Sequence, residues 1–180
     1  MTPFVKAFFD EATFTVSYVV REPHGKACAI IDSVLDFDNA SGRTDTKAAD
    51  EIIAYVQEEG LNVEWILESH VHADHLSAAP YIQSRLGGKI GIGGHVTDVQ
   101  KVFGDLFDAG PDFARDGSQF GHLFQDGERF SIGNIEAEAI HTPGHTANHC
   151  VFALEGTGIL FSADHVMAWA TSIVAPPDGA

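Results

Sequence analysis

A short histidine-rich segment, His70-Val71-His72-Ala73-Asp74-His75, contains the residue types that bind transition metals. It follows an apolar, strand-like run at residues 63–67, so these side chains are expected at the end of a strand. Neutral imidazole suits zinc, iron and copper, and an added carboxylate suits hydrolytic zinc or non-haem iron. The alternative is a solvated loop that is rich in histidine by chance. Ligand-type residues in matching contexts downstream argue against that alternative.

Two later segments share this layout, in which a ligand-type residue follows an apolar strand. In the first, Pro143 and Gly144 form a tight turn that aims His145, and in the second, Asp164 can cap or bridge a metal. The pattern predicts two metal sites. These are His70, His72 and His145 with Asp164 or water for the first, and Asp74, His75 and Asp164 for most of the second.

The elements that must position these side chains are strands and helices in alternation. Strand patterns cover residues 12–20, 27–31, 63–67, 89–92, 129–132, 135–140, 150–154 and 159–161. In the first of these strands, Phe14, Val16, Tyr18 and Val20 are expected on one face. Helical spacing covers 47–59 (with Thr46 as N-cap and Gly60 as the stop), 76–86 and about 96–107. Residues 108–128 are expected to form a surface loop, and the whole pattern favours packed sheets with helices outside.

Composition narrows the class of protein. A chain of 180 residues with 44% hydrophobic residues is expected to form one globular domain, residues 1–180. The net charge of −16 argues against nucleic acid or an anionic membrane as partner. No run is long and apolar enough to span a membrane, and the N-terminus lacks the layout of a secretory signal. Two cysteines, Cys28 and Cys150, are too few for a disulfide framework, so a cytoplasmic location is expected.

The motifs around the histidines resemble a known family, the metallo-β-lactamase superfamily. The segment Glu68-Ser69-His70-Val71-His72-Ala73-Asp74-His75-Leu76-Ser77-Ala78-Ala79 looks like its bacterial β-lactamase-like, persulfide dioxygenase branch. So do Ile31-Asp32-Ser33-Val34-Leu35-Asp36, Ser41-Gly42-Arg43-Thr44 and Leu86-Gly87-Gly88-Lys89-Ile90-Gly91-Ile92-Gly93. The resemblance covers roughly residues 10–146. It implies an α/β fold of the αββα sandwich type, with the metal in a cleft at the strand ends.

The resemblance also implies roles for individual residues. In the iron branch, the ligands are His70, His145 and Asp164, while His72 orients water or substrate and Asp74 and His75 are outer supports. In zinc hydrolases of the superfamily, His72 binds metal, Asp74 and His75 hold the second metal, and Asp74 can act as a base on water. Asp32 is expected to be a buried hydrogen-bonding strut. His141, His149 and His165 are expected to flank the site, although His149 or His165 could substitute for a missing last ligand.

After His145 the match breaks. The dioxygenase branch follows its metal-bridging aspartate with a Gly-Thr-x-Arg-x-Asp-Phe-like stretch that holds the thiol substrate. Here Asp164 is followed by His165 and a tail without Lys or Arg, because all ten basic residues lie at or before Arg129. Charge-assisted pairs to Arg usually fix substrate carboxylates, so the tail is more like that of hydrolases. Superfamily members normally continue further, so the domain is expected to lack its C-terminal elements.

Three functions remain open. The first is a persulfide dioxygenase-like enzyme with one Fe(II) per chain, which oxidises a thiol persulfide to sulfite with O₂. The second is a hydrolase with one or two Zn(II) ions, which acts on thioesters, lactones or related esters. The third is an inactive metal-binding domain, in which a homodimer could cover exposed core.

Overall fold

The computed structural model describes residues 2–72 and 74–166, which form two compact units. The first unit contains residues 2–68, 72, 74–90 and 131–135, and the second contains 69–71, 91–130 and 136–166. The predicted tail beyond Val166 lies outside the described residues. In the described part of the chain, no helix combines the length and the apolar character needed to traverse a lipid bilayer.

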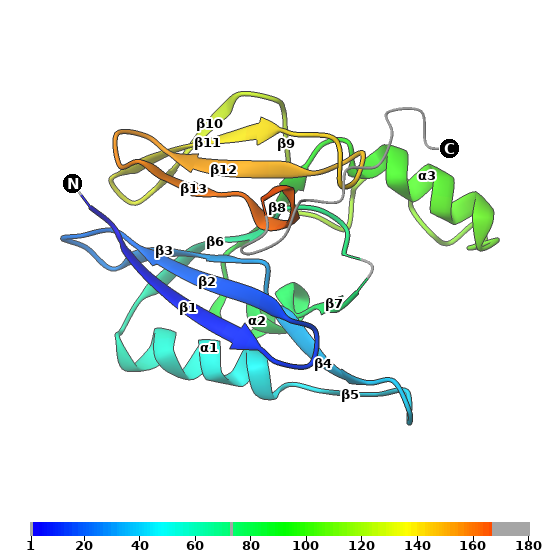
Figure 1. The fold of residues 1–180 in the computed structure, drawn as a ribbon, viewed down its shortest axis with the longest axis horizontal. Coiled ribbons are helices and arrows are strands. Elements are labelled where there is room, and N and C mark those ends of the chain that lie inside the picture. Colours follow the sequence, from blue (N-terminus) through cyan, green and yellow to red (C-terminus); the bar gives the residue numbers. More distant parts are fainter. Residues whose placement is uncertain (1, 73, 167–180) are drawn as a thin grey trace. The chain divides into compact units, whose positions relative to one another are not determined.

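The first unit consists of two sheets and two helices (Figure 1). Its strands are β1 (Phe4–Asp10), β2 (Thr15–Arg21), β3 (Ala27–Ile31), β4 (Val34–Asp38), β5 (Arg43–Asp45), β6 (Asn62–Glu68), β7 (Leu76–Ser77) and the start of β8 (Lys89–Gly93). Its helices are α1 (Lys47–Glu58) and α2 (Ala79–Leu86). The larger sheet has the order β1-β2-β3-β6-β8 within this unit, and β5-β4-β7 form a second, small sheet.

Strands β3 and β6 form the centre of the larger sheet. Every residue of β3 is buried, and β3 pairs in parallel with β6 so that Ile31 lies opposite Leu67. Past the end of β3, the backbone N–H of Asp32 donates to the carbonyl of Leu67 at 2.9 Å. Because parallel strands end at the same edge of a sheet, this pairing places Asp32 beside the end of β6, where Glu68 lies.

Helix α1 packs against this sheet. Figure 1 shows it alongside β1 to β3, and the ring of Tyr55 meets the ring of Phe8 from β1 edge-on at 5.7 Å between centroids. Thr46 occupies the N-cap position as predicted, but its hydroxyl donates to the Asp50 carboxylate instead of capping a backbone N–H. Gly60 follows the helix with φ +60°, which is the conformation expected of a glycine that ends a helix.

Glu22 joins two turns of the first unit. Its carboxylate is buried and accepts hydrogen bonds from the N–H of Ala27 (3.1 Å) and from the N–H and side-chain amide of Asn134 (3.0 and 2.9 Å). A Cβ atom added to Gly25 would lie 1.8 Å from this carboxylate, and one added to Gly133 would lie 2.4 Å away. The hydrogen bonds from Ala27 and Asn134 hold the pKa of the Glu22 carboxyl below its usual value.

The second unit contains an antiparallel sheet with the order β10-β11-β12-β13. Its elements are the end of β8, α3 (Val96–Leu106), β9 (His122–Phe124), β10 (Glu128–Ile132), β11 (Ile135–His141), β12 (Cys150–Leu154) and β13 (Ile159–Phe161), followed by a 3-10 turn at Ala163–His165. Residues 131–135 of β10, β11 and their turn belong to the first unit. Three buried rings, those of Phe124, Phe130 and Phe152, pack together at 4.8–6.1 Å between centroids.

Four sequence predictions of secondary structure need correction. The strand predicted at 12–20 starts at Thr15, because Phe14 lies in the preceding turn with φ +57° and is 80% exposed. Val20 of the predicted face is buried, but Ser17 and Val19 of the opposite face are buried as well, so β2 is covered on both faces and Phe14 does not belong to it. The predicted helix 76–86 divides into β7 and α2, and the predicted loop 108–128 contains β9. Strands β1, β4 and β5 have no counterpart among the predicted strands.

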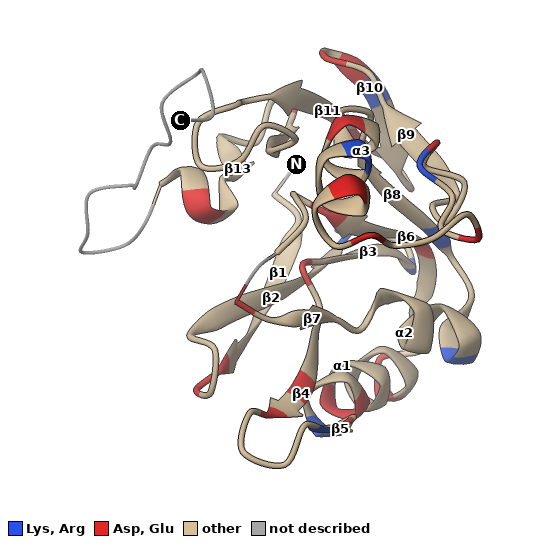
Figure 2. Ribbon diagram, turned by 90° about the vertical axis from the view of Figure 1, so that its right-hand side faces the viewer, with Lys and Arg blue, Asp and Glu red and all other residues tan. Residues whose placement is uncertain are grey.

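Acidic side chains and buried thiols are two further features of the fold. Figure 2 shows acidic positions on α1, β4 and α3. Both cysteines are buried. Burial, together with the nearby charge of Glu64, raises the pKa of the Cys28 thiol to about 12.

Candidate metal centre

Three predicted ligands converge in the second unit. One ligand atom from each of His70, His145 and Asp164 lies within 4.8 Å of the other two. The Oδ2 atom of Asp164 is 3.3 Å from His145 Nε2 and 3.8 Å from His70 Nε2. Metal–nitrogen bonds of about 2.1 Å place neighbouring ligand atoms roughly 3.0–3.5 Å apart. The Asp164–His145 distance lies in this range and the Asp164–His70 distance is slightly longer, so a small inward movement of these side chains would let them hold one transition-metal ion.

His70 is the buried member of this group, with 2% of its surface exposed. Its Nδ1 is 2.9 Å from the Ser69 hydroxyl, which turns Nε2 toward Asp164. The carbonyl of Ser69 accepts from the backbone N–H of Cys150 at 2.8 Å, so the start of β12 holds this segment in place. A hydrogen bond at the second nitrogen is the usual way to fix the ring of a metal-binding histidine.

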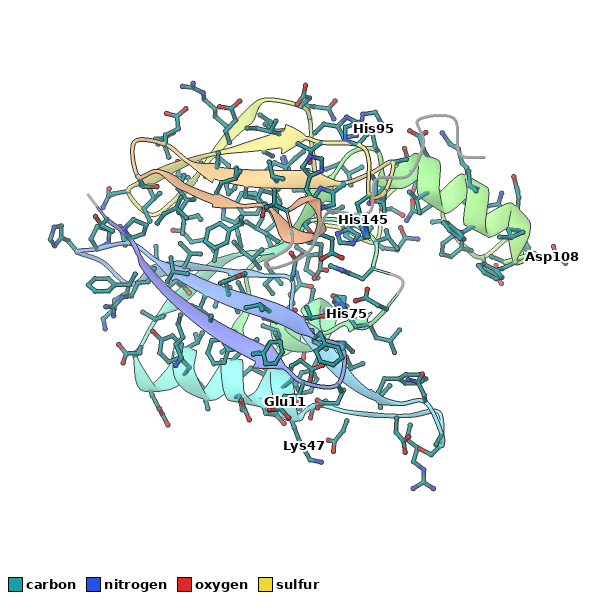
Figure 3. All side chains as sticks on the ribbon, in the orientation of Figure 1. Glu11, Lys47, His75, His95, Asp108 and His145 are labelled. Carbon is teal, nitrogen blue, oxygen red and sulfur yellow. The ribbon has the colours of Figure 1, made fainter. Side chains whose placement is uncertain are left out.

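His145 (labelled in Figure 3) and Asp164 come from the connections that flank β12 and β13. The loop that carries His145 is closed by a hydrogen bond from the Thr142 N–H to the His149 carbonyl at 2.9 Å. Asp164 lies in the 3-10 turn after β13, and the residue before it, Ala163, has φ +42°. A non-glycine residue rarely adopts that conformation.

A second donor group lies in the first unit and consists of His72, Asp74 and His75. The rings of His72 and His75 are 4.0 Å apart between centroids. His75 Nδ1 lies 3.3 Å from the Thr15 hydroxyl and 3.6 Å from the Asp74 carboxylate. Its Nε2 is buried and has no hydrogen-bond partner in the described part of the chain. A metal ion is one partner that such an atom could take.

His72 is turned toward two buried acids of the same unit. Its Nε2 is 3.4 Å from Asp32 Oδ1 and 3.8 Å from Glu68 Oε2. His72, Asp32 and Glu68 form a third group whose ligand atoms lie within 4.8 Å of one another. Asp32 is buried and holds His72, as expected of a hydrogen-bonding strut, and it has φ +50°. Glu68, which also accepts from the Ser77 hydroxyl at 2.8 Å, was not predicted to matter.

Burial and charge act against each other in this acidic pocket. Burial lowers the pKa of His72, but the hydrogen bond and charge of Asp32 and the charge of Glu68 outweigh it and raise that pKa to about 9. Burial and the charge of Asp32 raise the pKa of Glu68 to about 8. Burial and the neighbouring His72 lower the pKa of His75. At neutral pH these shifts favour the protonated, positively charged form of His72 and the neutral form of His75.

The flanking histidines take different positions in the second unit. His149 and His165 lie at the His70 group, with the His149 ring stacked on His70 at 5.0 Å. His141 instead stacks on His95 at 4.0 Å and contacts the carbonyl of Ala147. The sequence pattern did not predict the contacts of Ser69 and His149 with His70, because nothing in residue spacing shows which ring face or nitrogen a neighbour will meet.

Comparison with known proteins identifies the family. The profile of the metallo-beta-lactamase superfamily matches residues 10–179. A probable metallo-hydrolase of Burkholderia pseudomallei is 58% identical over 142 residues, which are 79% of this chain and 48% of that protein. A beta-lactamase hydrolase-like protein of Agrobacterium fabrum is 52% identical over 144 residues, 80% of this chain and 33% of that protein. The chain spans about half or less of the length of these relatives.

Solved structures confirm the predicted fold class. A metallo-beta-lactamase from Staphylococcus aureus superposes with a TM-score of 0.66 at 25% identity, over 90% of this chain and 42% of that one. ETHE1 from Myxococcus xanthus superposes with a TM-score of 0.62 at 20% identity, over 84% of this chain and 53% of that one, a likeness of fold alone. With its α/β architecture and the match over residues 10–179, the chain belongs to the metallo-β-lactamase superfamily.

Proposed function

We propose that this chain carries the metal centre of a persulfide dioxygenase-like enzyme, with one Fe(II) ion on His70, His145 and Asp164. The observation that carries the proposal is the convergence of two imidazole nitrogens and one carboxylate oxygen within 4.8 Å. Two histidines and one carboxylate are the ligand set of non-haem iron oxygenases. Iron bound there would supply open coordination positions for a sulfur ligand and dioxygen.

The proposed reaction converts a thiol persulfide, dioxygen and water into the parent thiol, sulfite and two protons. The sulfur–sulfur bond breaks, and dioxygen accepts the electrons that the outer sulfur loses. The residues of this chain serve to hold and orient the centre. Ser69 fixes the His70 ring through Nδ1, and the 3-10 turn at Ala163–His165 presents the Asp164 carboxylate to His145.

In this proposal His72, Asp74 and His75 are not iron ligands. The Nε2 of His72 contacts Asp32 and Glu68. Such contacts suit an outer residue that orients water or substrate, rather than a ligand of the iron. Asp74 and His75 would act as supports of His72. The proposed substrate is a small molecule. The cytoplasmic location, the organisation as one domain and the formation of a homodimer stay predictions.

A zinc hydrolase of thioesters or related esters is the second candidate. The second donor group, with its buried His75 Nε2, is the observation that favours it, because hydrolases of this kind can use two zinc ions. The names of the Burkholderia and Agrobacterium relatives, which describe hydrolases, support it as well. The absence of basic residues after Arg129 removes the usual partners of an anionic substrate from the C-terminal part.

Metal analysis and two assays separate these candidates. The chain would be purified without added metal and analysed for iron and zinc, then assayed for oxygen uptake with a small-thiol persulfide and for thioester hydrolysis. About one iron per chain with persulfide-dependent oxygen uptake supports the dioxygenase. About two zinc ions with thioester hydrolysis supports the hydrolase. An iron-loaded chain that consumes no oxygen contradicts the first proposal, and bound metal with neither activity indicates an inactive metal-binding domain.

A further inference from the structure

His149 has no role in the proposed function, yet it is the fully buried neighbour of the candidate centre. It lies directly before β12 and has 0% of its surface exposed. Its ring stacks on the ring of His70 with 5.0 Å between centroids and 29° between planes. The ring of His145 meets it edge-on at 6.1 Å.

The geometry of the stack separates His149 from the ligands. A near-parallel arrangement sets the face of one ring against the face of the other, whereas a metal is bound in the ring plane at a nitrogen. The donor group of the second unit accordingly contains His70, His145 and Asp164 but not His149. His149 is therefore a contact of a ligand rather than a replacement for one.

Thr142 anchors His149 at both its side chain and its backbone. The Thr142 hydroxyl is 3.0 Å from His149 Nδ1, and the Thr142 N–H donates to the His149 carbonyl at 2.9 Å. The next residue, Cys150, donates its N–H to the Ser69 carbonyl at 2.8 Å. These bonds fix the ring of His149 relative to the segment that carries His70.

The ring of His70 is thereby held in two directions. Ser69 holds its edge at Nδ1, and a hydrogen bond at one edge atom does not by itself fix the tilt of the ring plane. The face of His149 opposes this tilt, and stacked rings at this separation attract each other. A metal ligand that is already oriented loses less entropy when the metal binds.

We propose that His149, anchored by Thr142, is a positioning residue that sets the plane of the His70 ring for metal binding. The proposal rests on the proposed function, because it requires that His70 binds a metal. Loss of such an outer contact typically weakens metal binding by roughly 10- to 100-fold. The stack therefore serves the affinity and the geometry of the centre, and it takes no part in the reaction itself.

The test is a titration of the full chain with Co(II), followed through the visible absorption of the bound ion and by competition with a chelator. His149→Ala is expected to weaken Co(II) binding by roughly 10- to 100-fold and to change the absorption spectrum. His149→Phe keeps a ring face and is expected to restore most of the affinity. Thr142→Val removes the hydroxyl at nearly constant shape and should weaken binding, whereas Thr142→Ser should retain it.

Phe152→Leu is the matched control for loosened packing, because Phe152 is buried in β12, the strand that begins directly after His149, and contacts Phe124 and Phe130. It should lower the free energy of unfolding and leave Co(II) affinity unchanged. Equal affinity and equal spectra of wild type, His149→Ala and Thr142→Val would overturn the inference, as would an equal loss in Phe152→Leu. A wild-type chain that binds no Co(II) would instead overturn the proposed function, and this inference with it.

Discussion

Single residues in the two donor groups differ in which imidazole nitrogen contacts the protein. His70 uses Nδ1 for Ser69 and turns Nε2 to Asp164. His72 uses Nε2 for Asp32 and Glu68. The two histidines therefore differ in the ring nitrogen that their protein neighbours occupy. This difference predicts different effects of removing each side chain.

His145→Ala is expected to abolish retention of any metal in the second unit, a larger effect than the roughly 10- to 100-fold loss typical of an outer contact. The reason is that, among residues 2–72 and 74–166, three ligand atoms converge there, and the substitution removes one of them. Metal content after dialysis is the measurement. His122→Ala, which removes a histidine paired with Glu128, is the control and should keep its metal. Full metal content in His145→Ala would contradict the assignment of ligands.

His72→Ala separates the two metal chemistries. It is expected to spare iron binding but to impair zinc binding, because the proposed iron ligands do not include His72. The measurement is the affinity of the variant for Fe(II), determined anaerobically, and for Zn(II). If both affinities fall equally, the role proposed for His72 as an orienting residue is wrong.

The two turns joined by Glu22 contain Gly25 and Gly133, where an added Cβ would come closest to a neighbouring atom. Gly133→Ala would place a methyl group 2.4 Å from the Glu22 carboxylate, whose displacement would break its bonds to Ala27 and Asn134. With φ +56° as an added cost, a loss of about 2–4 kcal/mol in the free energy of unfolding is expected. Chemical denaturation measures it.

Gly156→Ala is the control for backbone strain alone. Gly156 has φ +67°, but an added Cβ would meet nothing within 4 Å. It should cost only about 1–2 kcal/mol. Equal losses in Gly133→Ala and Gly156→Ala would show that the Glu22 contact contributes nothing.

The same carboxylate predicts a pH dependence. The folded-state pKa of Glu22 is lowered, so its contribution to stability is present above the unfolded-state pKa of about 4.3 and is lost as the pH falls through the folded-state pKa. Glu22→Gln should therefore be less stable than wild type at neutral pH, and the difference should shrink in acid. Urea denaturation between neutral pH and about pH 3 measures this. Glu51→Gln, on an exposed part of α1, controls for the loss of one negative charge, and a difference independent of pH would refute the assignment.

The sequence predicts most of the strands that consist mainly of apolar residues and are followed by a polar, ligand-type or turn residue. Strand β3 is a continuous apolar run, and β6 is apolar apart from Asn62, Glu64 and Glu68. Their parallel pairing explains why Asp32 and Glu68 lie side by side. Strand β1 was missed because most of its residues are exposed and it shows no clean alternation. The helix predicted from Leu76 starts later, because residues 76–77 pair with β4 and this tertiary contact overrides the helical pattern. Ring stacking and choice of nitrogen depend on three-dimensional contacts and have no signal in residue spacing.

The whole molecule is strongly acidic, with a net charge of −16. Figure 2 shows acidic positions on α1 and β4 of one unit and on α3 of the other. Like charges on a folded chain repel one another, and dissolved salt screens this repulsion. Stability should therefore depend on ionic strength in one direction.

Raising NaCl from about 0.02 to 0.5 M is expected to raise the thermal midpoint by roughly 2–4 °C, the change that corresponds to about 1 kcal/mol in a chain of this length. Thermal denaturation followed by circular dichroism measures it, and KCl serves as the control for a specific effect of sodium. A midpoint that falls with salt in both would show that attractive ion pairs outweigh the net repulsion.

Because Cys28 and Cys150 are buried, the reaction of each thiol with an added reagent reports the opening of the fold around it. Both sulfurs lie inside folded units, and the high pKa of Cys28 keeps that thiol in its unreactive, protonated form. A maleimide should therefore react with these thiols only when the folded structure opens and exposes them. The rate of labelling then reports how often each unit exposes its interior, and mass spectrometry of the two cysteine peptides would time the two units separately.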